Sequence, residues 1–222
     1  MNLYMISGSI LLLNFLILLV NNNIIHKIVG GNSFFKKVIR RTLYFLPYII
    51  FFYTYKPYIF SNKNIIKSVI IIVLLTIIMY TILYNKYNFF FNEGFIFMCG
   101  KIKFKDIIVN LYTNIGSALV QESFYKLYVF QTLFYIFDIR MLYSVTITSI
   151  IFMLDHLLCI GSLSRFRVSD FISQFIMSFI SLILYVYSGN IIIAFSLHFL
   201  YNLFISFNNM YMYYIQNKSK GR

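Results

Sequence analysis

The feature that most constrains the fold of this sequence is a series of long apolar runs, each close to the length that crosses a lipid bilayer. About 20 apolar residues in an α-helix span the hydrocarbon core of a membrane. Backbone polar groups in lipid must be satisfied within the segment itself, so we expect an all-α, polytopic transmembrane helix bundle. Seven runs qualify, at residues 3–20, 43–60, 65–84, 107–137, 141–160, 171–187 and 191–207.

The segment 88–99 is aromatic but short. It is interrupted by Asn92, Glu93 and Gly94, which favours an interfacial or re-entrant piece and leaves an eighth crossing open. The run at 3–20 lacks a basic leader and a small-residue cleavage site, so we expect a retained first helix.

The distribution of positive charge predicts a topology. The chain is 60% hydrophobic with a net charge of +13, but its Lys and Arg residues lie in loops between apolar runs rather than on one soluble face. We therefore expect the lipid bilayer as a partner and no nucleic acid. Most of the 19 cations fall on one side if the N-terminus is outside and the C-terminus is cytoplasmic. This pattern predicts a multi-pass membrane protein, and we expect its membrane to be a bacterial plasma membrane.

The remaining global features indicate a single membrane unit. Cys99 and Cys159 are far apart and form no CxxC motif, so we expect reduced, packed thiols. We divide the chain into N-terminal helices and basic loops (1–106), a core (107–210) and a basic tail (211–222).

A few ionisable groups inside the apolar runs mark the candidate site. Glu122 and Asp155 are the acidic residues well inside such runs, and His156 and His198 are placed likewise. Ionisable groups are costly in hydrocarbon and by default indicate a functional site. Three pairs are spaced four residues apart and so share a helix face. They are Glu122 with Lys126, Phe152 with His156, and His198 with Asn202.

Depth in the membrane suggests that these groups meet. If the fourth span proper runs outward from about Gly116, Glu122 lies roughly 9 Å from its cytoplasmic start at 1.5 Å per residue, and His156 lies roughly 6 Å from the cytoplasmic end of the antiparallel fifth span. His198 falls near the middle of the last span. We expect a cavity that opens toward the cytoplasm and is lined by all three.

The motifs resemble those of a membrane protease family. Gln121–Lys126 is similar to EExxxR, Phe152–His156 to FxxxH, and His198–Asn202 to HxxxN, in that order and on separate spans. This set resembles the CPBP family, which comprises CAAX prenyl endopeptidases and bacteriocin-processing or immunity proteins, also called Abi proteins. The resemblance covers about 107–207. It implies an intramembrane endopeptidase that acts on a membrane-associated or prenyl-like peptide.

The resemblance also implies catalytic roles. Glu122 and His156 would activate a water molecule, and His198 and Asn202 would stabilise the oxyanion. No cofactor is required by the sequence, although zinc on Glu122, His156 and His198 is an alternative without the HExxH spacing. The motif residues that we expect to support the site are Gln121, Lys126 and Phe152.

The first motif departs from the family pattern. Gln121 stands where the family has its first glutamate, and an amide cannot accept the proton. Glu122 is rotated by about 100° from that position. Lys126 replaces arginine and loses the bidentate fork. Whether the chain is an enzyme therefore depends on whether Glu122 substitutes for the lost base.

Two other functions stay open. A catalytically weakened relative would act by binding, in bacteriocin self-immunity or membrane regulation. A small transporter would use Glu122 as a proton site. Each polar pair also has a purely structural explanation, as an ion pair or as a hydrogen bond between helices.

Overall fold

The computed structural model describes residues 24–25, 27–31, 33–54, 64–92, 96, 98, 100–158 and 168–218. The predicted span at 3–20, together with Glu93, Cys99 and Cys159, lies outside the described residues. The part of the chain that the structure describes is helical and contains no strand. This confirms the all-α class.

Every predicted apolar run with described residues contains a helix. The elements are α2 (Phe34–Thr54), α3 (Ile65–Tyr87), the 3₁₀ turn η1 (Asn88–Phe91), α5 (Phe104–Glu122), the π-helical η2 (Ser123–Phe130) and η3 (Thr132–Ile136), α6 (Met141–Leu158), α8 (Val168–Ser188) and α9 (Ile191–Lys218).

Three of these helices, α3, α8 and α9, are long and apolar enough to cross a membrane, and α6 is apolar but shorter. The protein is therefore a helical membrane protein. The count of seven or eight spans stays a prediction.

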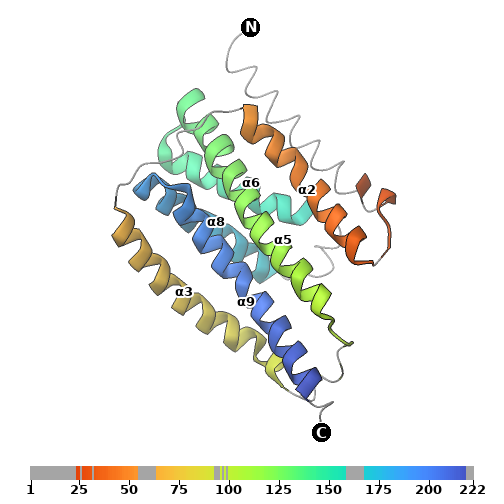
Figure 1. Cartoon of the computed structure of the whole chain (residues 1–222). Helices are drawn as coiled ribbons and strands as arrows, with labels where there is room; N and C mark the ends of the chain where they lie inside the picture. The colour runs from red at the N-terminus through yellow and green to blue at the C-terminus, as the bar shows by residue number, and fades with distance from the viewer. Residues whose placement is uncertain are drawn as a thin grey trace.

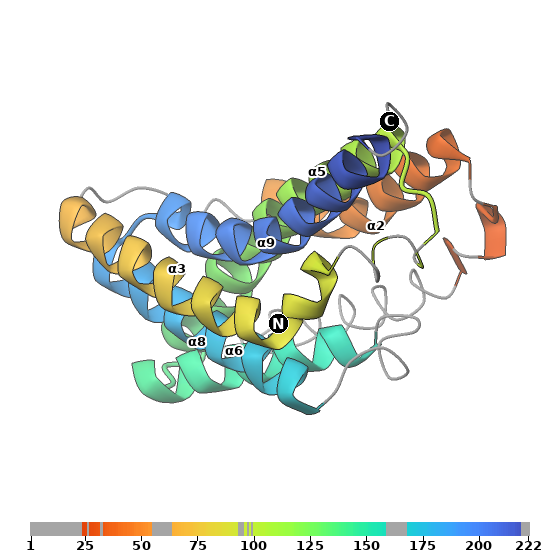
Figure 2. The same ribbon diagram turned by 90° about the horizontal axis from the view of Figure 1, so that it is seen from below.

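The described helices pack in two layers. α5 lies between α2 and α9 in one layer, and α6 packs against α8 in the other (Figures 1 and 2). α3 covers the outer side of α9 and touches α8. The π-helical η2 continues α5 and contacts both α2 and α6. The end of α5 therefore lies in the interior, where the two layers meet.

A tight turn sets the register of α8 and α9. Gly189 has φ +64°, a left-handed conformation that glycine adopts without strain. The Asn190 side chain accepts a hydrogen bond from the Ile192 N–H at 2.9 Å, which caps the start of α9. Ser181 precedes Gly189 by eight residues and His198 follows it by nine. At 1.5 Å per residue, both lie roughly 12 to 14 Å from the turn and thus at the same depth.

A missing side chain on α5 lets α2 approach closely. A Cβ atom at Gly116 would lie 2.3 Å from Cε2 of Phe45 on α2. Phe45 is 4% exposed and belongs to the main core cluster, together with Tyr125 and Phe152. Small residues permit such close helix contacts in membranes. Gly116 is therefore required for the packing of α2 beside the candidate site.

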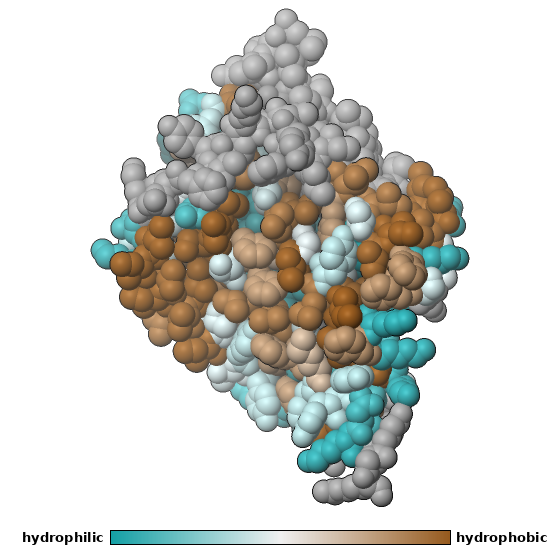
Figure 3. Space-filling model, viewed as in Figure 1, coloured by the Kyte–Doolittle hydropathy of each residue, from teal (hydrophilic) through white to brown (hydrophobic). Residues whose placement is uncertain are grey.

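Ionic contacts join the helix ends at one end of the bundle. Lys37 binds Asp106 at 2.6 Å, and Lys86 binds Asp170 at 2.5 Å. A further hydrogen bond links the segment before α5 to the end of α9. The segments that meet here are those that the charge pattern assigned to the cytoplasm. Figure 3 shows hydrophilic side chains gathered at the lower right, where α5 begins and α9 ends, and apolar ones over α3.

Candidate functional site

A carboxylate with no solvent exposure lies at the centre of the bundle. Glu122, the last residue of α5, is 0% exposed. Its Oε1 lies 2.9 Å from Nδ1 of His198 on α9. Its Oε2 accepts a hydrogen bond from the Ser181 hydroxyl on α8 at 2.9 Å and lies 2.8 Å from Nζ of Lys126. Three elements besides α5 therefore converge on one side chain.

Lys126 supplies the counter-charge for Glu122. It lies on η2, four residues after Glu122, and is itself 0% exposed. Its ammonium approaches Oε2 as an ion pair but outside the directions of a hydrogen bond. The same Nζ lies 5.7 Å from the ring centre of Phe152, on the electron-rich face of an aromatic ring. The charges of Glu122 and Lys126 therefore cancel, and the ammonium lies close to both the carboxylate and the aromatic ring.

The hydrogen bond to Glu122 determines which nitrogen of His198 is available. A carboxylate can only accept a hydrogen bond, so Nδ1 of His198 carries the proton. In the neutral ring, Nε2 then has the free lone pair. Because His198 is 2% exposed and bonded to a fixed partner, the ring has a single orientation.

The second motif lies beside His198 through an aromatic contact. Phe152 of α6 is 0% exposed, and its ring lies 5.7 Å from that of His198 and 4.6 Å from that of His156. Nδ1 of His156 lies 2.9 Å from the Phe152 carbonyl oxygen, which only accepts. Nε2 of His156 is thus its basic nitrogen as well. His156 is half-buried, and its hydrogen bond goes to its own helix rather than to Glu122.

The other motif residues, Asn202 and Gln121, have no hydrogen bond to Glu122 among the described contacts. Asn202 lies one turn after His198, and its amide nitrogen donates to the Ser117 hydroxyl of α5 at 3.4 Å. Its backbone carbonyl accepts a hydrogen bond from Asn114 at 3.1 Å. Gln121 is buried, with 5% exposure. The structure thus joins Glu122 directly to the third motif, while Phe152 contacts both histidines.

Sequence analysis missed Ser181. Serine is common in membrane helices, so its residue type alone carries no signal. The position of Ser181 in its helix is the usable signal, because Ser181 and His198 are nearly equidistant from the turn at Gly189. The buried side chains of Gln174 and Ser178 lie seven and three residues earlier on α8. The buried face of α8 is therefore polar where it meets Glu122.

The described residues do not form a metal site. Among them, no group of three or more His, Cys, Asp or Glu side chains lies close enough to hold a metal ion. Among the described residues, the partners of the Glu122 oxygens are two hydrogen-bond donors and one ammonium. An ammonium 2.8 Å from the carboxylate disfavours a dication on the same oxygen. The groups around Glu122 therefore disfavour a metal ion at this carboxylate.

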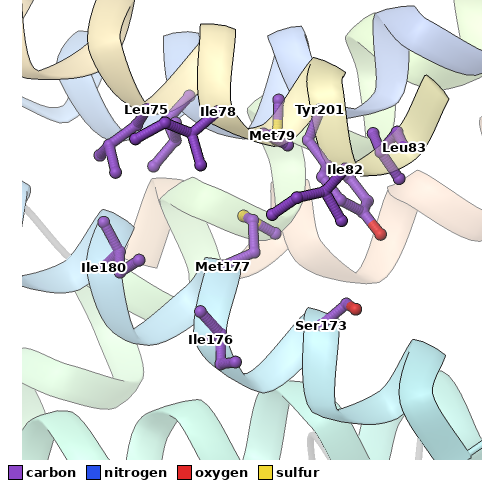
Figure 4. Close-up of a pocket in the computed structure, with 11 residues that line it drawn as sticks. Leu75, Ile78, Met79, Ile82, Leu83, Ser173, Ile176, Met177, Ile180 and Tyr201 are labelled. Atoms are coloured by element: carbon purple, nitrogen blue, oxygen red, sulfur yellow. The ribbon is translucent and has the colours of Figure 1, made fainter. Parts of the chain in front are cut away.

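An apolar cavity of about 230 Å³ lies beside this centre, between α3, α8 and α9. Figure 4 shows side chains of α3 and α8 facing each other across it, with Tyr201 at its edge. Leu197, directly before His198, also lines it. Met177 lines the cavity and packs in the same core cluster as Phe152. The cavity therefore adjoins the helix turn that carries His198 and the core cluster that contains Phe152.

Comparison with known proteins identifies the region that carries the motifs. Residues 103–204 match the family model described as type II CAAX prenyl endopeptidase Rce1-like. The match runs from the residue before α5 into α9 and contains all three motifs. It confirms the resemblance to a membrane protease family. No curated protein and no solved structure matches the chain.

Proposed function

Because residues 103–204 of this chain match the family model described as type II CAAX prenyl endopeptidase Rce1-like, we propose that the protein is an intramembrane endopeptidase that cleaves a membrane-associated peptide. The observation that carries the proposal is the fully buried Glu122 carboxylate bonded to His198, with Phe152 in ring contact with both His198 and His156. Ionisable groups inside a membrane bundle are costly and by default indicate a functional site.

His156 is the general base of the proposed reaction. Its Nε2 takes a proton from water as the water oxygen attacks the peptide carbonyl carbon. The same nitrogen then returns the proton to the leaving amine as the C–N bond breaks, so protons balance over the cycle. Glu122 contributes indirectly, because its two oxygens already bind Lys126, Ser181 and His198.

His198 and Asn202 stabilise the oxyanion. We assign to His198 its doubly protonated form, with Nδ1–H on Glu122 and Nε2–H directed at the developing negative charge. The Glu122 carboxylate 2.9 Å away stabilises the positive ring, as an acidic residue does for the histidine of a catalytic triad. Asn202 lies on the same helix face one turn away and offers an amide donor.

The apolar cavity supports a substrate with an apolar part. Almost all of its lining is aliphatic, aromatic or thioether, and it lies between α3, α8 and α9, which are long and apolar enough to cross a membrane. Such a surface favours an isoprenyl chain or an apolar peptide segment over a polar peptide. We propose that this part of a prenyl-like substrate lies there while the scissile bond reaches the histidines.

Cleavage of farnesylated peptides by the purified protein in liposomes, followed by mass spectrometry, tests this function. His156→Ala, Glu122→Gln and His198→Ala should each lower the rate by about 100-fold or more. Double variants should be no slower than single ones, because the residues act as a unit. Asp170→Asn is the control, since its pair with Lys86 lies at the end of the bundle. Full activity in the His156 variant would contradict the proposed base.

Metal dependence is tested in the same assay with EDTA and 1,10-phenanthroline. The donor set around Glu122 leads us to expect an unchanged rate. Loss of the activity on chelation, with recovery on addition of zinc, would favour the zinc alternative on Glu122, His156 and His198.

Gln121 and the fully engaged Glu122 favour a second function. A family member without its first glutamate, whose remaining carboxylate already binds three groups, suits a protein that binds a membrane peptide without cutting it. We propose that such a binding protein would act in bacteriocin self-immunity or in membrane regulation. Peptide binding without cleavage, in a wild type that still protects cells, would support this alternative.

We also propose that the N-terminus lies outside the membrane and the C-terminus in the cytoplasm. Reporter fusions at Lys37, at Lys103 and at the C-terminus should then report the cytoplasm, and a fusion near Lys63 the exterior. A cytoplasmic signal near Lys63 would overturn this orientation.

A further inference from the structure

A second cavity, unrelated to the motifs, lies at the charged end of the bundle. It has a volume of about 370 Å³ and is bordered by the start of α2, the segment before α5, the first turns of α5 and the later part of α9. Its lining includes four cations, one carboxylate and two amides. These residues are Lys37, Arg40, Arg41, Lys101, Asp106, Asn110 and Asn209.

The lining of this cavity has a net positive charge, which favours an anionic ligand. Asp106 is paired with Lys37 at 2.6 Å, so the other three cations exceed the negative charge of the lining. One Arg40 nitrogen donates to the carbonyls of Val29 and Gly31 at 3.2 and 3.0 Å, which fixes the guanidinium at the rim. A guanidinium has five N–H donors and retains others for a ligand. Such a fork matches phosphate geometry.

The depth of the cavity fits a lipid headgroup. Asn209 lies 18 residues after the start of α9 at Ile191. At 1.5 Å per residue, this is roughly 27 Å along the helix. The hydrocarbon core of a bilayer is about 30 Å thick. The cavity is therefore at the level where lipid phosphates lie.

The helices that border the cavity also expose apolar side chains at helical spacing. On α2 these residues are Phe35, Ile39 and Leu43, and on α5 they are Phe104 and Ile108. A free phosphate ion makes no apolar contacts with such surfaces, whereas the acyl chains of a lipid can cover them. Basic pockets between membrane helices on the cytoplasmic side are suited to anionic headgroups.

We propose that this cavity binds the phosphodiester headgroup of an anionic membrane lipid, with the acyl chains along α2 and α5. The ligand would hold α2 against α5 and α9, the two helices that carry Glu122 and His198. The site is separate from the proposed peptidase chemistry and does not depend on it.

Titration of dihexanoyl phosphatidylglycerol into the purified full-length protein, in a neutral maltoside detergent, tests the proposal. The thermal unfolding midpoint is followed by circular dichroism, because a ligand of the folded state raises it with concentration. We expect a saturable rise with phosphatidylglycerol. Dihexanoyl phosphatidylcholine and sodium phosphate at equal concentration should leave the midpoint unchanged.

Two matched lysine variants locate the effect. Lys101 lines the cavity and Lys105 does not, and both are exposed at the same end of the bundle. Lys101→Ala should weaken the apparent affinity by about fivefold, the value of one cation near a charged lipid. Lys105→Ala should leave it unchanged. An equal loss in both variants would indicate a diffuse basic surface and overturn the site.

The lipid controls are equally decisive. A full response to sodium phosphate would assign the cavity to a soluble anion instead of a lipid. A full response to phosphatidylcholine would show that the headgroup charge is not recognised.

Discussion

Two lysine–carboxylate pairs in this protein have nearly the same geometry and very different surroundings. Lys126 lies 2.8 Å from Glu122, and both side chains are 0% exposed. Lys37 lies 2.6 Å from Asp106, and these side chains are 31% and 35% exposed. Exposed pairs contribute about 0 to 1 kcal/mol, whereas loss of one partner of a buried pair costs about 3 to 5 kcal/mol. Burial, rather than distance, therefore separates the two regions.

The comparison also bears on function. A buried ion pair can often be replaced by apolar residues at no cost in stability. Stability alone therefore does not explain why the Glu122–Lys126 pair lies at the centre of a membrane bundle. The pair at the bundle end follows the charge pattern of the loops and joins α2 to α5.

The largest expected effect is from removing one buried charge. Lys126→Met leaves Glu122 with an unpaired charge and should lower the free energy of unfolding by about 3 to 5 kcal/mol. Lys37→Met should lower it by less than about 1 kcal/mol. Unfolding midpoints in detergent measure both. Adding Glu122→Gln to Lys126→Met should restore stability but not activity, and equal losses in the two single variants would refute the comparison.

The next effect concerns Ser181. Ser181→Ala removes a hydrogen bond to a charged group and should cost about 1.5 to 3 kcal/mol. Ser196→Ala is the matched control, because the Ser196 hydroxyl bonds only to the Ile192 carbonyl of its own helix among the described contacts. The same unfolding measurement applies. If both alanine variants behave alike, the Ser181 bond does not hold Glu122.

A smaller effect is expected from adding a carboxylate beside the buried pair. If Gln121 is the remnant of a lost base, Gln121→Glu should raise peptide cleavage by about tenfold or more, the equivalent of about 1.4 kcal/mol. If Glu122 has taken over, Gln121→Glu should change little and Glu122→Gln should abolish cleavage. Absence of cleavage in the wild type and in Gln121→Glu, with a persisting cellular phenotype, would reject the peptidase.

The smallest effect is the acid sensitivity of the exposed pair. The hydrogen bond from Lys37 lowers the pKa of Asp106 below its ordinary value of 3.8. A lowered carboxyl pKa gives stability that is complete above the unfolded pKa and is lost as the pH falls through the folded pKa. Wild type should therefore lose slightly more stability than Asp106→Asn between about pH 5 and pH 2. Identical pH profiles would show that the pair contributes nothing.

Much of the architecture follows from local pattern. Apolar runs long enough for a bilayer become helices wherever the structure describes them, since no other unit satisfies the backbone in lipid. The i, i+4 spacing likewise anticipates the Glu122–Lys126 contact, because it depends on one helix face. The predicted convergence of Glu122 and His198 is seen as a contact between α5 and α9. The predicted depth of Glu122 is wrong, because α5 begins at Phe104 and Glu122 lies roughly 27 Å from its start.

Contacts between layers could not be derived in this way. Ser181 carries no sequence signal of its own, and its role beside Glu122 depends on the rotation of α8 about its axis. The sequence predicted that His156, Glu122 and His198 line one cavity, but the hydrogen bond at Nδ1 of His156 goes to the Phe152 carbonyl of its own helix. Rotations of this kind depend on the packing of many side chains at once.

By itself, the sequence determined that this protein is a helical membrane bundle, which motif residues share a helix face, and where its cations gather. These properties depend on hydrocarbon thickness, helical periodicity and charge, all of which act within a segment. Only the tertiary structure decided that Glu122 binds His198, Ser181 and Lys126 at once, and that α2, α5 and α9 enclose a basic cavity. Such contacts join residues far apart in the chain, so their geometry depends on how helices pack and not on any one helix.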